Sequence, residues 1–320
     1  MKYRFITILH FLKLDKPACR ILLASGMISN KADLLKEVLS YDNPLALHTL
    51  GVHSIDAFQD STFYLVDGTF DEGITMADVD AFGTSMTFAF LRQIQWLMDK
   101  LWMVRDNSIY VRDGFLFVYE NSFDDGVTFK GSLSTVNSKA STVLEEVAFS
   151  KEEIVALAKD MPMVSVQEVR SGKNYRDATQ FQFFKSGKLG RKMTAWIYVF
   201  YARAAAALTI KVLMYITAME ALVSTSTAEL SHQVSERVAV LLGKDARERL
   251  GIYDDIKKGY GIRSKAAHGE PVRGTEADTA ALLVTIDDYT RRLMALDTPY
   301  DLDQEKMNEF FMERLMGEYA

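Results

Sequence analysis

The first half of the chain alternates between strand-like and helix-like patterns of apolar residues. Tyr3–Leu12 and Thr62–Val66 are rich in β-branched and aromatic residues, which is typical of strands. Ser108–Glu120 predicts a β-hairpin, because Asp113-Gly114 separates two apolar runs and this dipeptide favours a tight turn. A second Asp-Gly pair, at residues 125 and 126, precedes another expected strand over Val127–Leu133.

One long helix is expected among these strands. Ser85–Val104 has apolar residues at helical spacing, which predicts a helix packed on the sheet. The apolar stripe consists of Phe88, Leu91, Ile94, Leu97, Met98 and Leu101. This mixture of strands and a helix predicts an α+β domain over residues 1–148.

The following segment, residues 149–192, is expected to connect two domains. Shortly before it, Ser134–Ser141 is small and polar, which predicts a loop or linker. Ser150 stands three residues before Glu153 and ahead of an apolar run. This is the pattern of a capping box, so we expect a helix to begin directly after Ser150.

The last part of the chain, residues 193–320, shows helical periodicity without strand signals. Short connections between consecutive helices predict antiparallel neighbours and hence an all-α helical bundle. Glycines at positions 243 and 269 are expected to end the second and third helices. The expected helices are Lys192–Val223, a second from Ala228 or Glu229 to Leu242, Asp245–His268 with an interruption at Gly259 and Gly261 left open, Thr275–Leu296 and Leu302–Met316.

Composition places the chain among ordinary folded proteins. Hydrophobic residues make up 48% and charged residues 25% of the 320 residues. The single cysteine, Cys19, excludes an intramolecular disulfide framework and a multi-cysteine zinc site, and it fits a reducing, cytoplasmic compartment. The most apolar long stretch, Met193–Val223, carries Arg203 and Lys211 in its interior, so we expect a core helix there and no membrane partner.

The net charge of −6 would by itself argue against a nucleic-acid partner, because phosphate binding requires clustered Lys and Arg. The average conceals a basic stretch between Arg170 and Lys192, which is interleaved with aromatic residues. Such a stretch can hold an RNA backbone and stack bases, although a solvated basic hairpin between two domains is the alternative. Its candidate RNA ligands are Arg170, Lys173, Arg176, Lys185, Lys188, Arg191 and Lys192.

Several motifs of known chemistry are absent from the sequence. There is no Gly-x4-Gly-Lys-Ser/Thr loop, no Gly-x-Gly-x-x-Gly fingerprint and no Gly-x-Ser-x-Gly elbow. The five histidines form no His-Glu-x-x-His pair, and no EF-hand loop is present. We therefore expect no metal site and no other cofactor, and any chemistry should be metal-independent.

One segment of the helical half combines an arginine and a histidine, with Arg263 followed by Ser264 and His268 followed by Gly269. Positions five apart on a straight helix point about 140° away from each other, so one regular helix cannot aim both side chains at one phosphate. They converge if the helix ends or bends near Ala267. Alternatively, a second copy of the chain contributes the complementary residue across a two-fold axis.

The pair has the chemistry that RNA cleavage requires. An arginine fork matches a phosphodiester, and histidine moves a proton near neutral pH. RNA supplies its own nucleophile, the 2′-hydroxyl, so no metal need activate water. The negative end of a helix dipole favours a charged histidine there, which suits an acid. An arginine on a helix surface and a histidine at a helix end are also common without any such role.

Together with the helices before it, this segment resembles the HEPN superfamily and, within it, the ApeA-like branch. The resemblance extends from Thr194 to the C-terminus. It implies a bundle of four or five helices that dimerises, often acting as a metal-independent endoribonuclease in bacterial defence against phage. The residues that carry it are Glu220-Ala221-Leu222, Glu229-Leu230-Ser231-His232 continuing to Ser235-Glu236-Arg237-Val238-Ala239, and Arg263-Ser264-Lys265-Ala266-Ala267-His268-Gly269.

The resemblance also implies roles for individual residues. Arg263 and His268 would be the catalytic pair, and Ser264 the polar position that follows the arginine. Cleavage would leave a cyclic phosphate and a 5′-hydroxyl. Lys265, in the same motif, joins the candidate RNA ligands.

Two acids compete for a supporting role in this site. Glu229 is a candidate catalytic acid, although an acid that only interacts with the helix dipole is equally compatible with its position. Glu220 is the alternative, and in an otherwise apolar helix it needs a partner, either Arg237 or Arg263. We expect His232 to be a structural or partly exposed helix residue.

These expectations combine into a homodimeric HEPN-type endoribonuclease that arrests growth in anti-phage defence. Its α+β domain would sense a trigger, either phage-derived or a nucleotide. The alternative keeps the fold without catalysis, as a module that binds nucleotides or RNA or docks a partner. A third hypothesis is a structural protein whose basic segment docks on an acidic partner.

Overall fold

The computed structural model describes residues 1–123, 125–172 and 189–317. The chain divides into two compact units. The first contains Met1–Val136 and the chain from Glu145 to residue 172, and the second contains Asn137–Leu144 and residues 189–317. The first unit is α+β and the second is a helical bundle, which confirms the predicted fold class.

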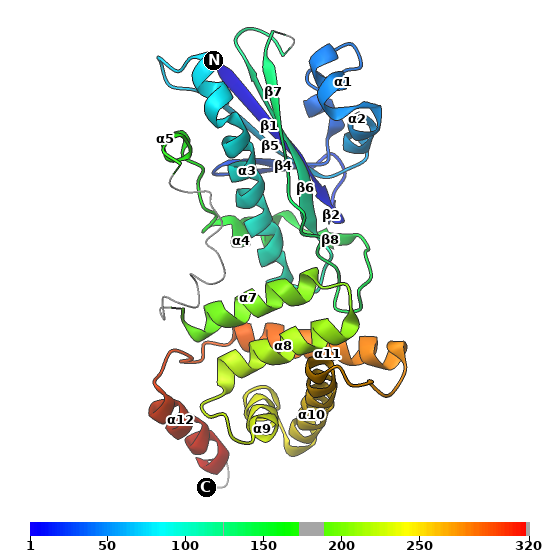
Figure 1. Ribbon diagram of the computed structural model, residues 1–320, viewed down its shortest axis with the longest axis vertical. Coiled ribbons are helices and arrows are strands. Elements are labelled where there is room, and N and C mark those ends of the chain that lie inside the picture. Colours follow the sequence, from blue (N-terminus) through cyan, green and yellow to red (C-terminus); the bar gives the residue numbers. More distant parts are fainter. Residues whose placement is uncertain (124, 173–188, 318–320) are drawn as a thin grey trace. The chain divides into compact units, whose positions relative to one another are not determined.

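A six-stranded antiparallel sheet forms the centre of the first unit, in the order β3-β4-β5-β1-β6-β7 (Figure 1). The two remaining strands, β2 and β8, form a separate parallel pair. The strands are β1 Lys2–His10, β2 Leu12–Leu14, β3 Arg20–Leu23, β4 Gly26–Ser29, β5 Phe63–Thr69, β6 Tyr110–Tyr119, β7 Val127–Ser132 and β8 Val147–Phe149.

Helices cover both faces of this sheet, so its central strands are apolar on both sides. Helix α3, Met76–Lys100, packs on one face, and η1 (Ala32–Leu35), α1 (Pro44–Leu50) and α2 (Val52–Gln59) lie on the other (Figure 1). Successive side chains of a strand point to opposite faces. Accordingly Phe5 of β1 joins the core beneath α3, while its neighbour Ile6 joins the core beneath α1 and α2.

The hairpin predicted for Ser108–Glu120 is wrong. Strand β6 runs without a turn from Tyr110 to Tyr119 and pairs with both β1 and β7. Gly114 allows close packing instead, because a Cβ there would lie 2.7 Å from Phe5 Cε2 and 2.8 Å from Leu91 Cγ. The glycine that indicated a turn is therefore needed where α3 crosses the sheet.

Other predicted elements of the first unit are confirmed. Strand β7 follows the second Asp-Gly pair, and α4 (Lys151–Ala158) begins with the predicted capping box of Ser150 and Glu153. A short helix, α5 (Val166–Arg170), follows. Helix α3 begins earlier than expected because Thr75 and Asp78 form another capping box.

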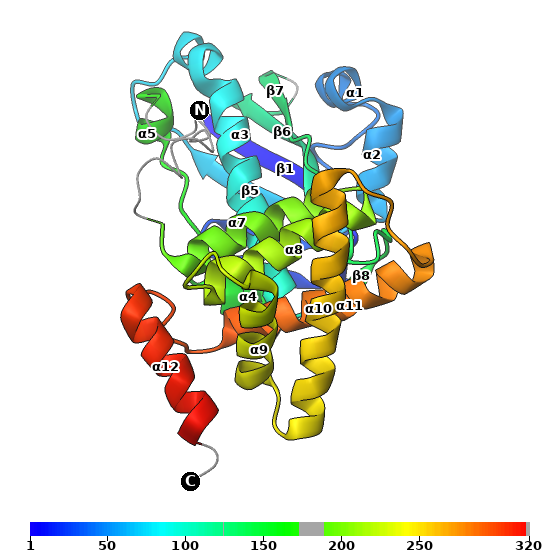
Figure 2. The same ribbon diagram turned by 60° about the horizontal axis from the view of Figure 1, so that its bottom comes forward.

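The second unit is a bundle in which α8 lies against α7, α9, α10 and α11 (Figure 2). The predicted helices ending at Leu242, His268 and Met316 are observed, and α11 follows the predicted Thr275–Leu296 closely. The helices are α7 Arg191–Ala204, α8 Leu208–Val223, α9 Leu230–Leu242, α10 Ala246–His268, α11 Glu276–Ala295 and α12 Gln304–Met316.

The single helix predicted for Lys192–Val223 is wrong, because α7 ends at Ala204 and α8 begins at Leu208. The buried ammonium group of Lys211 donates to the carbonyl oxygens of Ala202 (3.0 Å) and Arg203 (3.3 Å) at the end of α7. A continuous helix would use these carbonyls for its own hydrogen bonds. The break therefore provides acceptors for a buried cation.

The polar segment predicted as a loop or linker, Ser134–Ser141, has no helix or strand, and part of it packs in the bundle. The Ser138 N–H donates to the Arg203 carbonyl (3.0 Å), and Lys211 Nζ donates to the Ser138 carbonyl (3.4 Å).

Among the described residues, no helix is both long and apolar enough to cross a membrane.

Two glycines lie within α10, and neither interrupts the helix. Substituting them should change the stability of the protein in opposite directions. A Cβ at Gly259 would lie 2.8 Å from Ile286 Cδ1 and 2.9 Å from Ile216 Cδ1, whereas a Cβ at Gly261 meets nothing within 4 Å. We expect Gly259→Val to lower the free energy of unfolding by about 1–3 kcal/mol through overpacking. Gly261→Ala should raise it by about 0.5–1 kcal/mol through helix propensity. Urea unfolding of both variants tests this, and shifts in the same direction would contradict the packing described.

Candidate active site

Helix α10 carries the Arg-x4-His element predicted from the sequence. The helix begins after Asp245, whose side chain caps it, and it runs unbroken to His268. Gly269 follows with a φ of 70°, and its N–H donates to the carbonyl of Lys265. The predicted glycine-capped end of the helix is therefore confirmed.

Arg263 is held by an acidic residue from α8. One carboxylate oxygen of Glu220 lies 3.5 Å from Arg263 Nη2, and the other accepts a hydrogen bond of 2.5 Å from the Tyr260 hydroxyl. Tyr260 precedes Arg263 by three residues, so both side chains leave α10 on the same face. We call these three residues the Glu220 cluster.

Burial and charge set the protonation of this cluster. Burial raises the pKa of Tyr260 far above its usual range, and the hydrogen bond to Glu220 raises it further, while the charge of Arg263 acts in the opposite direction. Tyr260 therefore stays protonated and donates to Glu220. In the described part of the chain, the buried Nε of Arg263 has no hydrogen-bond partner. The Arg263 side chain is nevertheless 32% exposed, so an anion can still reach part of it.

His268 is exposed and is the last residue of α10. Its side chain leaves the helix about 140° from that of Arg263 and about 7.5 Å further along the axis. A helix that is regular up to His268 does not aim the two side chains at one phosphate within a single chain.

The two other candidates from the same motif lie beside Arg263 in the sequence. Ser264 is exposed and Lys265 is half-buried. Within the ranges that the structure describes, neither side chain has a hydrogen-bond or ion-pair partner. Both therefore remain available to a ligand.

Glu229 lies elsewhere on the bundle, at the start of α9. It has a left-handed backbone with a φ of 52°, and its side chain makes no capping hydrogen bond. It lines a pocket of about 360 Å³ together with His232 and Arg237. His232 Nδ1 lies 2.9 Å from the Tyr253 hydroxyl, which gives this histidine a local structural partner.

The structure distinguishes the two arginines considered as partners of Glu220. Arg237 is buried and donates to Thr225 Oγ1 (3.0 Å) and Asn308 Oδ1 (2.7 Å). Burial lowers the pKa of Arg237, and these contacts hold it within its own region of the bundle. Arg263 is therefore the partner of Glu220.

Three of the basic candidates from residues 170–192 are engaged within their own unit. Arg170 pairs with an acid, whereas Arg191 and Lys192 donate to backbone carbonyls at helix ends. Their contacts are to Asp78 (3.4 Å), to the Ser224 carbonyl (2.7 Å) and to the Leu296 carbonyl (2.8 Å), respectively. The other four, Lys173, Arg176, Lys185 and Lys188, lie outside the described residues.

Sequence reasoning missed Tyr260 as a member of this site. Its position three residues before Arg263 was the available signal, since i and i+3 side chains are neighbours on a helix.

In residues 1–123, 125–172 and 189–317, the His, Cys, Asp and Glu side chains form no group of three or more that could hold a metal ion. Comparison of the chain with family models, curated proteins and solved structures gave no match.

Proposed function

We propose that this chain is a homodimeric, HEPN-like endoribonuclease that cleaves RNA without a metal ion. In this proposal Arg263 binds the scissile phosphate and His268 transfers a proton. The observation that carries the proposal is the Glu220 cluster, in which a carboxylate holds Arg263 through Nη2 while the arginine side chain stays 32% exposed. An arginine positioned in this way can donate to a phosphate oxygen.

The reaction is an internal transfer of the phosphoryl group. The 2′-hydroxyl oxygen attacks the adjacent phosphorus and loses its proton to solvent or to a base, while the bond from phosphorus to the 5′-oxygen breaks. Protonated His268 donates its proton to the leaving 5′-oxygen, which yields a cyclic phosphate and a 5′-hydroxyl. Arg263 stabilises the negative charge that builds up on the phosphate oxygens. No water molecule and no oxidant is consumed in this step.

The homodimer completes the proposed site. Because α10 separates the two side chains in direction and along its axis, a second copy related by two-fold symmetry is needed to place an Arg263 and a His268 at one phosphate. Ser264 and Lys265 would then face the RNA from the same helix. We further propose that the first unit controls this activity, as expected for an effector of anti-phage defence.

Cleavage of RNA by the purified full chain tests the function. We expect wild-type protein to cut total RNA equally well with and without EDTA, and the products to carry cyclic phosphate and 5′-hydroxyl ends. Loss of cleavage in EDTA would contradict the metal-independent mechanism. RNA that is bound but never cut would instead favour the non-catalytic binding module.

A further inference from the structure

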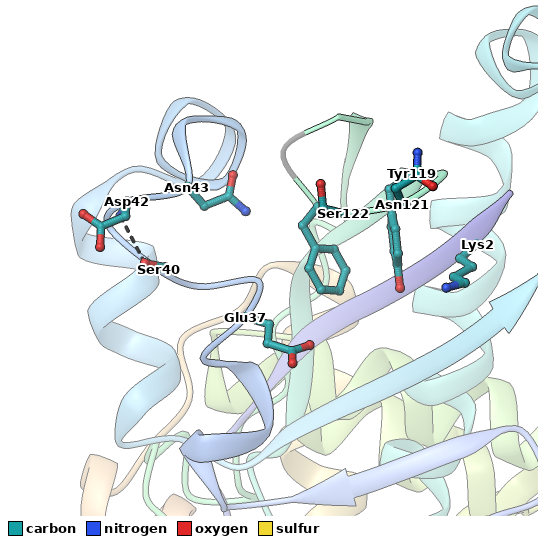
Figure 3. A pocket seen from close by; sticks show the side chains of 9 residues that line it. Lys2, Glu37, Ser40, Asp42, Asn43, Tyr119, Asn121 and Ser122 are labelled. Carbon is teal, nitrogen blue, oxygen red and sulfur yellow. Dashed lines mark hydrogen bonds between the residues drawn. The ribbon is translucent and has the colours of Figure 1, made fainter.

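A pocket of about 580 Å³ lies in the first unit, far along the chain from the Glu220 cluster (Figure 3). It is formed by the start of β1, residues 119–123 at and after the end of β6, and the segment before α1. Its volume falls within the range of roughly 300–1,000 Å³ that is typical of small-molecule sites. Nothing in the proposed ribonuclease mechanism uses it.

The walls of this pocket are held in place by hydrogen bonds. On one side, the Asn43 side chain is buried and accepts from the N–H groups of Leu45 and Ala46. On the other, the Asp125 carboxylate accepts from the backbone N–H groups of residues 120, 121 and 122. Preformed walls lower the cost of ordering the site when a ligand binds.

Two aromatic rings line the pocket beside the sheet. The ring centroids of Tyr119 and Phe123 lie 4.3 Å apart, and the guanidinium of Arg4 lies over the Phe123 ring at 5.1 Å. Arg4 is itself paired with Asp67 through contacts of 2.6 and 2.9 Å. Its charge is therefore already compensated, and the rings offer an apolar surface to a ligand.

Two side chains of opposite charge extend from opposite walls of the pocket. Lys2 lies on the side of the sheet, and Glu37 lies on the side of the segment before α1 (Figure 3). Both are exposed, and neither has an ion-pair partner among the residues described. Burial raises the pKa of Tyr119, and Glu37 and Asp67 raise it further while Arg4 lowers it, so the Tyr119 hydroxyl stays protonated.

The lining charges discriminate between classes of ligand. Glu37 and Asp42 outnumber Lys2, so the lining carries net negative charge. A nucleotide phosphate would meet this repulsion and find a single lysine to bind. A ligand with one positive and one negative group can instead match Glu37 and Lys2 together, while an aromatic ring packs on Tyr119 and Phe123.

We propose that this pocket binds a small zwitterion of the aromatic amino-acid type. Glu37 contacts its ammonium group and Lys2 its carboxylate. Tyr119 and Phe123 pack against its ring. This assignment does not depend on the ribonuclease proposal, because its test is a binding measurement on the first unit's own residues.

Four probes separate the contributions of ring, ammonium and carboxylate. L-Tryptophan carries all three groups, N-acetyl-L-tryptophan lacks the ammonium, tryptamine lacks the carboxylate, and AMP represents a nucleotide. In calorimetric titrations of the full chain, we expect L-tryptophan to bind about tenfold more tightly than either analogue, because each loses a hydrogen bond between charged groups. AMP should bind more weakly than L-tryptophan.

Two variants assign each charge to its residue. Glu37→Gln should weaken L-tryptophan about tenfold and should not weaken N-acetyl-L-tryptophan, since that probe has no ammonium to lose. Lys2→Gln should weaken L-tryptophan and should not weaken tryptamine. Glu120→Gln is the matched control, because Glu120 is an exposed acid next to the pocket that does not line it.

The outcomes that overturn the proposal are distinct. Tighter binding of AMP than of L-tryptophan would make the pocket a nucleotide site. Equal loss of L-tryptophan affinity in Glu37→Gln and Glu120→Gln would contradict the assignment of the ammonium contact to Glu37. Absence of binding by all four probes, in protein whose far-ultraviolet circular dichroism is native, would exclude this ligand class.

Discussion

Replacing His268 by alanine should lower the rate of RNA cleavage by about 10²–10⁴-fold, the usual contribution of a general acid. The leaving 5′-oxygen would then depart without a proton, while the fold should be unaffected because His268 is exposed at the last position of α10. Single-turnover cleavage of a labelled RNA measures the effect. His232→Ala is the matched control, because His232 is an exposed histidine of the same bundle that contacts Tyr253. If His268→Ala cleaves as fast as wild type, the assignment of the acid is wrong.

A mixed dimer of two variants tests whether each catalytic site takes residues from two copies of the chain. Arg263→Ala and His268→Ala homodimers should both cleave RNA far more slowly than wild type. A mixed dimer of the two, purified through two different affinity tags, keeps one Arg263 and one His268 on different copies. If a cleft uses one residue from each copy, about half of the wild-type sites are restored in this dimer. No recovery would show that both residues act from the same chain.

The second large effect is expected on stability, at a buried acid of α11. Asp287 is fully buried, accepts a hydrogen bond of 2.7 Å from the Tyr215 hydroxyl and pairs with Arg291 at 2.5 and 2.9 Å. Asp287→Ala should lower the free energy of unfolding by about 3–5 kcal/mol, because it breaks a buried ion pair and removes the acceptor that Tyr215 and Arg291 share. Urea unfolding followed by circular dichroism measures this loss.

The neighbouring acid provides the control for this experiment. Asp288 lies at the next position, its side chain is 53% exposed and its contact with Arg292 is 3.7 Å long. Exposed ion pairs contribute about 0–1 kcal/mol, so Asp288→Ala should change the stability little. Similar losses in both variants would mean that helix propensity, and not the buried pair, determines the effect at this position.

The ends of helices could be predicted from the sequence where the residues that determine them lie within one helical turn. The capping box of Ser150 and Glu153 and the left-handed glycine after His268 were both expected from local spacing, and both are observed. The reason is physical, because a helix end is satisfied by groups a few residues away. The Arg-x4-His element was therefore placed correctly at the end of α10.

Features set by packing could not be predicted in this way. The alanines over 204–207 have the highest helix propensity, yet the chain leaves the helix at Ala205. The buried ammonium of Lys211 requires carbonyl acceptors at the end of α7, and no local signal indicates that requirement. Gly114 is a similar case, since its closeness to α3 is visible only in the folded structure.

For the candidate site, the sequence by itself determined the chemistry available, namely an arginine and a histidine five positions apart on a helix that ends at a glycine. Only the tertiary structure decided which acid holds the arginine. Glu220 and Tyr260 are 40 positions apart in the sequence and meet because α8 packs against α10. Spacing along a chain reports which side chains share a helix face, whereas contacts between helices depend on how buried apolar surfaces fit together.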